Sequence, residues 1–223
     1  MITIRKQYLE EFNIDIYDIL TTPAIANTHL ALSGVFEYCV ELTGHLREYI
    51  EGSIVGGRVM TANNEKIHIK GKLADMDAVS LYPSAMVRLE GLPEGEPKIL
   101  TEEQLDYNTI KGFDWYIVDV EITDLKIKRA FPLLSIKNEK GTRIFTNEII
   151  GEVFRVDKIQ LEDLIEFQGV SFKLLKGLYF DEGFNPDIKE VVSKLFSTRK
   201  KLKAKGDEKE NIYKLILNSA YGK

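Results

Sequence analysis

Two groups of residues have the types and spacing needed to bind a nucleotide together with a metal ion. The first is the run from Asp77 to Pro83 (DAVSLYP), which places a carboxylate just ahead of an expected turn with an aromatic ring. The second lies near the C-terminus and comprises Arg199 and Lys203, then Lys214, Asn218 and Tyr221. An α-helix turns once per 3.6 residues, so Arg199 and Lys203 would share one helical face. Lys214, Asn218 and Tyr221 would share a face of a second helix for the same reason. A carboxylate and two cationic helix faces are what a metal-bound triphosphate requires.

Both groups resemble polymerase motifs of the family B DNA polymerases. Residues 77–83 resemble the first motif, and residues 214–222 (KLILNSAYG) resemble the second, which reads Lys-x-x-x-Asn-Ser-x-Tyr-Gly. Both motifs are long and occur in the family's order. The resemblance implies a template-directed, DNA-dependent DNA polymerase that transfers deoxynucleotides by a two-metal mechanism. A structural protein with chance motifs is a further alternative, disfavoured because both motifs are long.

The resemblance assigns roles to the residues of the first motif. Asp77 would hold a metal ion, and the carbonyl of Ala78 would help to bind it. Mg²⁺ is the expected cofactor, with two ions in the full enzyme, and Mn²⁺ is an alternative. Backbone N–H groups around Ser80 and Leu81 would contact phosphates, as in an anion-binding nest. Tyr82 would stack beneath the sugar and exclude a 2′-hydroxyl.

A purely structural role for Ser80, as a helix cap, stays open beside this one. Its hydroxyl could cap a helix that Pro83 begins. Both interpretations can hold together, because the family places this motif at a junction between a strand and a helix.

The second motif and the helix before it would bind the rest of the nucleotide. By resemblance, Arg199 and Lys203 are triphosphate ligands on the first helix. Lys214 is the phosphate ligand of the second helix and the proton donor to the leaving pyrophosphate. Asn218 and Tyr221 would line the pocket of the nascent base pair. Arginine suits bidentate phosphate contacts, whereas lysine acts as a point charge.

The pair Gly56-Gly57 resembles a third element of the family, the Tyr-x-Gly-Gly motif that contacts the template strand. The tyrosine position holds Ile54, which departs from the family pattern and has no aromatic ring for stacking. Glycines allow close approach of a phosphate to the backbone, although a bare Gly-Gly is more often a turn or bulge. The residues expected to contact DNA are Gly56, Gly57, Arg58, Gly222 and Lys223.

Charge is distributed unevenly along the chain. Residues 191–223 carry nine Lys/Arg and three acids, a net charge of +6, whereas the whole chain of 223 residues is −5, which leaves −11 for residues 1–190. This asymmetry suits an acidic body with one basic element that faces a polyanion. A solvated surface helix is the commoner origin of a basic run.

The pattern predicts an α+β fold with an antiparallel sheet. Helical spacing is expected at 4–19, 24–41, 43–51, 82–90 and 157–168, and strands at 53–60, 65–77, 113–123, 151–155 and 170–179. The strand at 65–77 would place Asp75 and Asp77 on one face, although the resemblance gives Asp75 no role. Residues 132–137 would pair with 113–123. Two further helices would form a hairpin, the first at 187–204 and the second capped by Asp207 with Glu210 as its capping-box partner.

Four segments follow from this organisation. Residues 1–52 resemble the helical lead-in to a proofreading exonuclease, 53–137 part of the palm, 138–183 an insertion, and 184–223 the fingers hairpin. The insertion favours the protein-primed branch, whose members use it to contact a terminal priming protein and the duplex. The expected partners are a DNA primer-template, dNTPs, this priming protein and the remainder of a polymerase.

The 223 residues contain neither the third family motif, Tyr-x-Asp-Thr-Asp-Ser, nor a segment that resembles the thumb. We therefore expect no primer extension by these residues alone. A split or truncated chain that binds nucleotide or DNA without catalysis is the alternative of a different class. No apolar run reaches membrane-spanning length, the N-terminus does not resemble a signal peptide, and the expected location is the cytoplasm of a bacterial host or a phage-infected cell.

Overall fold

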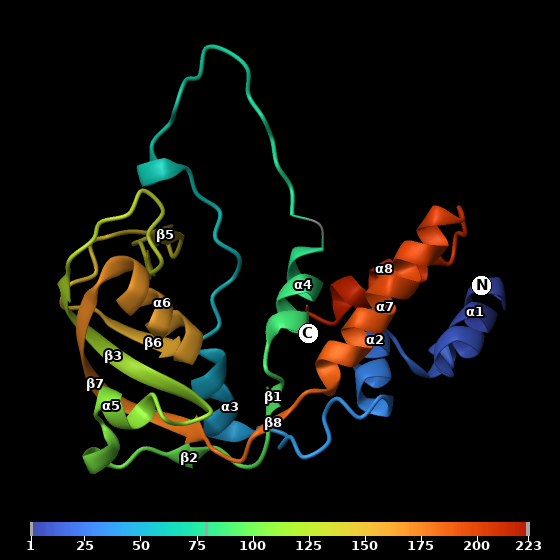
Figure 1. Cartoon of the computed structure of the whole chain (residues 1–223), viewed down its shortest axis with the longest axis horizontal. Helices are drawn as coiled ribbons and strands as arrows, with labels where there is room; N and C mark the ends of the chain where they lie inside the picture. Colours follow the sequence, from blue (N-terminus) through green and yellow to red (C-terminus); the bar gives the residue numbers. More distant parts are fainter. Residues whose placement is uncertain (1, 79, 222–223) are drawn as a thin grey trace. The chain divides into compact units, whose positions relative to one another are not determined.

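The structure of the chain, a computed structural model, describes residues 2–78 and 80–221 (Figure 1). Its contacts divide the chain into two units. The helical unit comprises Met1–Val40, Asp75–Gly95 and Gly183–Lys223, and the sheet unit comprises Glu41–Ala74 and Glu96–Glu182. The predicted palm segment 53–137 contributes to both units, so contacts group the chain differently from the four predicted segments, whose functional labels remain predictions.

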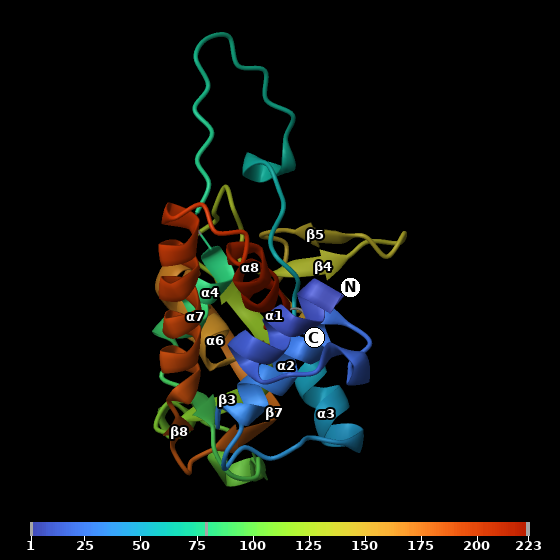
Figure 2. The ribbon, with the colours of Figure 1, turned by 90° about the vertical axis from the view of Figure 1, so that its right-hand side faces the viewer.

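Helices that lie far apart in the sequence build the helical unit. They are α1 (Ile2–Phe12), α2 (Thr22–Leu32), α4 (Leu81–Arg88), α7 (Asp187–Ala204) and α8 (Glu210–Ser219), with a 3-10 turn at Ile16–Asp18 and a two-residue strand pair, β1 (Leu92–Pro93) with β8 (Phe184–Asn185). Helix α4 packs on both α7 and α8, which lie side by side (Figures 1 and 2). None of the helices in the described residues is long and apolar enough to cross a membrane.

The first two helices are shorter than the predicted stretches 4–19 and 24–41. Asn13 adopts a φ of 54°, in the left-handed region, and α1 ends before it. Helix α2 ends at Leu32, with Ser33 as its cap residue and Gly34 in the left-handed region at a φ of 79°. Local capping and turn chemistry therefore overrides the longer helical periodicity.

One hydrophobic core joins these helices. Buried side chains from all of α1, α2, α7 and α8 contribute to it, among them Tyr8, Phe12, Ile25, Leu30, Val192, Leu195, Ile212, Ile216 and Leu217. Met86 and Val87 of α4 pack against the same core. The helix that carries the first motif and the helix that carries the second are thus held by one shared apolar interior.

The hairpin between α7 and α8 forms where it was predicted, but its cap differs. The carboxylate of Asp207 accepts a hydrogen bond from the N–H of Lys209 at 2.9 Å, and Lys209 itself occupies the cap position without a side-chain bond. The carboxylate of Glu210 bonds to Arg199. The predicted capping box of Asp207 and Glu210 is therefore wrong, because the Glu210 carboxylate accepts a hydrogen bond from Arg199 on the neighbouring helix instead.

An antiparallel sheet forms the centre of the sheet unit. Its strand order is β2 (Lys98–Ile99), β7 (Val170–Phe180), β3 (Trp115–Leu125) and β6 (Val153–Asp157). The other elements of this unit are α3 (Gly44–Glu51), α5 (Tyr107–Ile110), α6 (Lys158–Gln168), two 3-10 turns at Ala62–Asn64 (η2) and Glu102–Gln104 (η3), and a hairpin of β4 (Ser135–Lys137) with β5 (Arg143–Phe145). The predicted α+β class is confirmed.

The alternating strand predicted at 113–123 is present as β3, but its predicted partner is wrong. Val118 pairs with Val156 of β6 and with Gly177 of β7. Residues 135–137, which were expected to pair with β3, instead pair with 143–145. Period-two alternation identifies a strand without naming its neighbour, because pairing depends on contacts distant in sequence.

The two faces of β3 meet different partners. Tyr116, Val118, Val120 and Ile122 are buried in a core with α6, whereas Ile117 packs on the opposite face with Leu178, Phe180 and residues of α3. Asp119 lies on this second face. Alternation along β3 puts Asp119 on the same side as the polar Glu121 and Thr123, yet Asp119 is only 6% exposed because α3 covers it.

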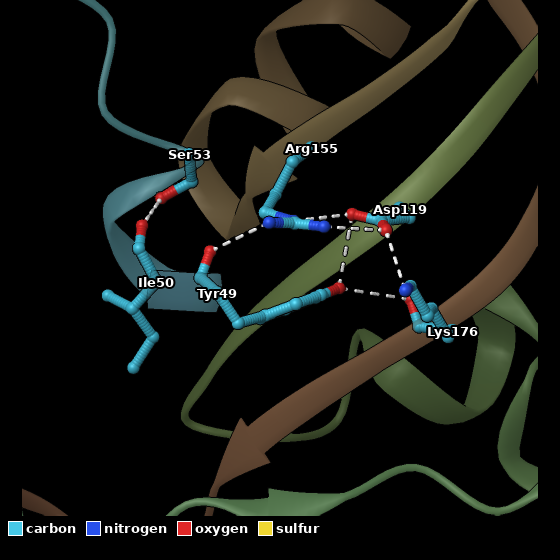
Figure 3. A network of polar contacts seen from close by, with 6 residues as sticks. All are labelled: Tyr49, Ile50, Ser53, Asp119, Arg155 and Lys176. Carbon is cyan, nitrogen blue, oxygen red and sulfur yellow. Dashed lines mark hydrogen bonds and ion pairs between the residues drawn. The ribbon is translucent and has the colours of Figure 1, made fainter. Parts of the chain in front are cut away.

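Asp119 is at the centre of a polar network that attaches α3 to the sheet (Figure 3). Arg155 donates to both of its carboxylate oxygens, from Nε at 2.7 Å and from an Nη at 2.9 Å. Tyr49 donates its hydroxyl to the same carboxylate at 3.2 Å, and Lys176 approaches it at 3.7 Å. The Arg155 guanidinium also lies over the Tyr49 ring, 3.7 Å from its centroid. Burial and the adjacent Asp119 carboxylate raise the pKa of Tyr49 well above its ordinary value, so the hydroxyl stays a donor.

The two strands predicted at 53–60 and 65–77 are absent. Residues 53–61 and 65–78 belong to no strand, and a 3-10 turn at Ala62–Asn64 separates them. The N–H of Asn63 and the side chain of Asn64 bond to carbonyls of Ala130 and Phe145, at 2.7 and 2.8 Å. A strand requires a partner for its backbone hydrogen bonds, and the described residues supply none here.

Candidate active site

The run from Asp77 to Tyr82 ends an extended segment and begins α4. Asp77 and Ala78 are exposed, and no strand carries Asp75 and Asp77 on a common face as was predicted. Ser80 has φ 50° and ψ 53°, a left-handed conformation that a non-glycine residue adopts at a cost in free energy. Its hydroxyl makes no capping bond, so the simple capping interpretation is wrong. The helix begins at Leu81, ahead of Pro83.

The two motif segments meet through an aromatic pair. The rings of Tyr82 and Tyr221 stack with their centroids 3.9 Å apart and an interplanar angle of 19°. They are 42% and 47% exposed, so one edge of the pair stays open to solvent. The first motif and the second, far apart in sequence, are therefore adjacent in the helical unit.

The exposed face of α8 carries the polar residues of the second motif. Lys214 and Asn218 are exposed, while Ile212, Tyr213, Ile216 and Leu217 are buried on the opposite side. The helix ends at Ser219, and Tyr221 follows its cap residue. The predicted common face of Lys214 and Asn218 is therefore present, and Tyr221 continues it past the end of the helix.

Arg199 already has a partner on the adjacent helix. Its Nε donates to the carboxylate of Glu210 at 3.1 Å, and both side chains are about one-fifth exposed, at 19% and 20%. Lys203, one turn further along α7, is exposed. A phosphate that reached Arg199 would compete with Glu210 or share the guanidinium with it.

A second acidic residue, Glu11, holds α8 through hydrogen bonds. Glu11 of α1 accepts hydrogen bonds from Lys209 Nζ and from the Tyr213 hydroxyl, the latter at 2.7 Å. The hydrogen bond from Lys209 is the largest cause that lowers the pKa of Glu11 below its ordinary value, and the hydrogen bond from Tyr213 is the second largest. This contact orients α8 so that its Lys214 face points away from the core.

The donor chemistry at Asp77 fits a hard divalent cation. A carboxylate and a backbone carbonyl are oxygen ligands, and Mg²⁺ is commonly held by one or two carboxylates plus substrate phosphates. Asp77 makes no hydrogen bond or ion pair to another described residue, so its oxygens are available. Within residues 2–78 and 80–221 no group of three histidine, cysteine or acidic side chains could hold a metal ion, which means that Asp77 and Ala78 are at most part of a ligand set.

The residues expected to contact DNA lie in different parts of the chain. Gly56, Gly57 and Arg58 belong to the sheet unit and are exposed. One Nη of Arg58 donates to the carbonyls of Phe131 and Pro132, at 3.3 and 2.9 Å, which ties this segment to the unit. Gly222 and Lys223 lie outside the described residues.

Sequence reasoning missed the two acids that hold the second motif in place. Glu210 was assigned to a cap, and Glu11 was not singled out. Glu210 lies eleven residues after Arg199 across a turn, a spacing that a predicted hairpin could have suggested. Nothing in the sequence pointed to Glu11, which is 198 residues from Lys209.

Comparison with known proteins decides the family. A family model described as "DNA polymerase type B, organellar and viral" matches residues 1–223. The chain belongs to this family of DNA polymerases. The resemblance drawn from the two motifs is thereby confirmed.

Solved structures of this polymerase class share the fold. The ternary complex of phi29 DNA polymerase with primer-template DNA and incoming nucleotides matches with a TM-score of 0.63 and 17% identity, over 97% of this chain and 37% of that chain. An orthorhombic crystal form of phi29 DNA polymerase matches with a TM-score of 0.61 and 19% identity, over 97% of this chain and 38% of that chain. The chain thus spans little more than a third of the phi29 polymerase. No curated protein sequence matches it significantly.

Proposed function

We propose that this chain supplies part of the nucleotide-binding and catalytic site of a template-directed DNA polymerase. The observation that carries the proposal is the stacking of Tyr82 on Tyr221, which joins the two polymerase motifs of a family B chain on one side of the helical unit. Packing of α4 on α7 and α8 supports it, because all the proposed nucleotide ligands then belong to one unit.

In this proposal the first motif binds the metal and the phosphates. The carboxylate of Asp77 and the carbonyl of Ala78 would hold Mg²⁺, with the nucleotide phosphates and carboxylates from the remainder of a polymerase completing the ligand set. The bound metal ions would neutralise charge on the attacking and leaving oxygens of a two-metal transfer. The N–H groups of Ser80 and Leu81, at the start of α4, would donate to a phosphate because a helix leaves its first N–H groups unpaired.

The second motif and α7 bind the triphosphate from the other side. Lys203 and Lys214 are exposed cations suited to phosphate contact, and Lys214 would pass a proton to the leaving pyrophosphate. Arg199 would contribute once a phosphate competes with Glu210. Asn218, Tyr221 and Tyr82 would contact the base and sugar.

The wider partners follow the same proposal. Primer-template DNA and incoming nucleotides, present in the phi29 complexes, would be the substrates here, with Gly56, Gly57, Arg58, Gly222 and Lys223 as DNA contacts. Protein priming, with a terminal protein that contacts residues 138–183, is proposed on the strength of the family match and the similarity to phi29 polymerase. A cytoplasmic site of action is proposed on the same ground.

Binding of dNTP and Mg²⁺ to the chain tests the assignment of Lys214. Lys214→Ala should weaken dNTP binding, measured by titration calorimetry in Mg²⁺, by about tenfold or more, because a charge-assisted hydrogen bond contributes roughly 1.5–3 kcal/mol. Lys205→Ala, which removes an exposed lysine at the end of α7, is the matched control and should bind as the unmodified chain does. Equal affinity of Lys214→Ala and the control would refute the phosphate assignment.

A further inference from the structure

A short segment of the sheet unit has two chemically different sides. From Lys66 to Lys70 the sequence alternates Lys-Ile-His-Ile-Lys, and successive side chains of an extended chain point to opposite sides. Lys66, His68 and Lys70 therefore share one side, and Ile67 and Ile69 share the other. Gly71 then bends the backbone at φ 142°, a conformation that favours glycine, and Lys72 follows the bend.

None of this segment is covered by the described chain. All residues from 65 to 74 are exposed, with Ile67 and Ile69 at 58% and 62% of full exposure. Residues 66–74 make no hydrogen bond to any described residue, and after the turn at Ala62–Asn64 they continue as extended chain without helix or strand (Figure 1). The preceding turn is fixed by the bonds of Asn63 and Asn64 to the sheet unit, so the segment begins from an anchored point.

The charge of this segment opposes that of the chain. Lys66, Lys70 and Lys72 contribute +3, and no acid lies between residues 66 and 74, whereas the whole chain carries −5. No ion pair neutralises these lysines within the described residues, although other exposed lysines of the sheet unit, such as Lys98 and Lys128, have acidic partners. Unpaired lysines along an exposed backbone are available to phosphates, which they bind as point charges.

We propose that the basic side chains of residues 66–72 bind the phosphate backbone of the DNA substrate. Lys66, Lys70 and Lys72 would each contact a phosphate, and the ring of His68 would add a hydrogen-bond donor beside them. Such contacts carry no base information, so the segment would hold DNA without regard to sequence. The inference rests on the proposed function, because it takes DNA as the substrate.

The salt dependence of DNA binding tests the inference directly. The probe is a fluorescein-labelled primer-template duplex, titrated with the chain at several salt concentrations and followed by fluorescence anisotropy. Each phosphate contact contributes about 0.9 to the slope of log K against log salt for duplex DNA. The triple variant Lys66→Ala, Lys70→Ala, Lys72→Ala should therefore lower the magnitude of the slope by about 2 to 3 and weaken binding at low salt at least tenfold.

Two controls separate a local contact from net charge and from disturbance of the segment. Lys111→Ala, Lys126→Ala, Lys137→Ala removes the same charge from exposed positions of the sheet unit outside residues 138–183 and should leave the slope within about 0.5 of the original value. Ile67→Ser with Ile69→Ser changes the opposite side without changing charge and should also leave the slope unaltered. Circular dichroism of each variant should match that of the unmodified chain, since the only described hydrogen bond removed is the exposed one from Lys111 to Asn108.

The outcomes distinguish this inference from the proposed function. If the unmodified chain binds the duplex and the first triple variant has the same slope as the charge-matched control, the segment is a solvated surface and the inference is wrong, while the proposed function stands. If the unmodified chain binds no DNA at any salt concentration, DNA contact by this chain is refuted and the inference is wrong with it.

Discussion

Tyr82 and Tyr221 stack ring on ring, although 138 residues lie between them in the sequence. Tyr82 is in the first turn of α4, and Tyr221 follows the end of α8. The contact lies where the first polymerase motif meets the second. The tertiary structure therefore brings together two motifs for which the sequence shows only their order along the chain.

The stacked pair should contribute measurably to the stability of the helical unit. In a double-mutant cycle of Tyr82→Ala and Tyr221→Ala, followed by urea unfolding, we expect a coupling free energy of about 0.5–1 kcal/mol, because aromatic pairs contribute roughly 0.5–1.5 kcal/mol beyond burial and this pair is half exposed. A cycle of Tyr221→Ala with Tyr38→Ala, whose ring is 76% exposed, should show no coupling. Equal coupling in both cycles would contradict the pairing.

Glu210 should restrain Arg199 from binding phosphate. Glu210→Gln removes the negative charge beside the guanidinium and should strengthen dNTP binding in Mg²⁺ a fewfold. Because both side chains of the pair are largely buried, we expect a loss of stability of about 1–2 kcal/mol. Glu208→Gln, an equal charge change on an exposed neighbour, is the control and should shift affinity less. Weaker binding by Glu210→Gln would mean that the ion pair positions Arg199 for the nucleotide, contrary to this prediction.

The network around Asp119 should be a major source of stability in the sheet unit. Asp119→Ala leaves the Arg155 guanidinium without its carboxylate in a largely buried site, and we expect a loss of about 2–4 kcal/mol in the free energy of unfolding. Replacing both, with Asp119→Ala and Arg155→Met, should recover part of that loss. Asp124→Ala, on the same strand but exposed, should cost less than about 0.5 kcal/mol. A similar loss for Asp119→Ala and Asp124→Ala would show that the network is energetically neutral.

Glu11 should make the helical unit sensitive to acid. Because the folded pKa of Glu11 is lowered from its ordinary value of 4.5, its contribution is present above that value and is lost as the pH falls through the folded pKa. Glu11→Gln should cost about 1–2 kcal/mol at pH 7 and less at pH 3, because protonation of the wild-type carboxyl as the pH falls removes the charge that the variant lacks. Urea unfolding at both pH values measures this difference.

A control for the acid prediction lies one residue away. Glu10 makes an exposed ion pair with Lys6 at 3.7 Å. Glu10→Gln should change stability by less than about 0.5 kcal/mol at either pH. An effect of Glu11→Gln that is equal at pH 7 and pH 3 would show that the charge of Glu11 is not what stabilises α8.

Local patterns in the sequence determined much of the fold and the composition of the site. The exposed face of Lys214 and Asn218 follows from helical periodicity, and the buried side of β3 follows from alternation, so both could be predicted. The two motifs were long enough to identify the family without any structure. These features depend on residues within a few turns or one strand, where spacing alone sets direction.

Tertiary structure alone decided which partners these residues meet. The segment 65–77 alternates like a strand but is unpaired, because a ladder needs a second strand that the described residues do not provide. Asp119 looked solvent-facing until α3 covered it, and Arg199 looked free until α8 placed Glu210 beside it. Burial, ion pairing and strand pairing depend on contacts between distant residues, and a single sequence contains no direct record of those contacts.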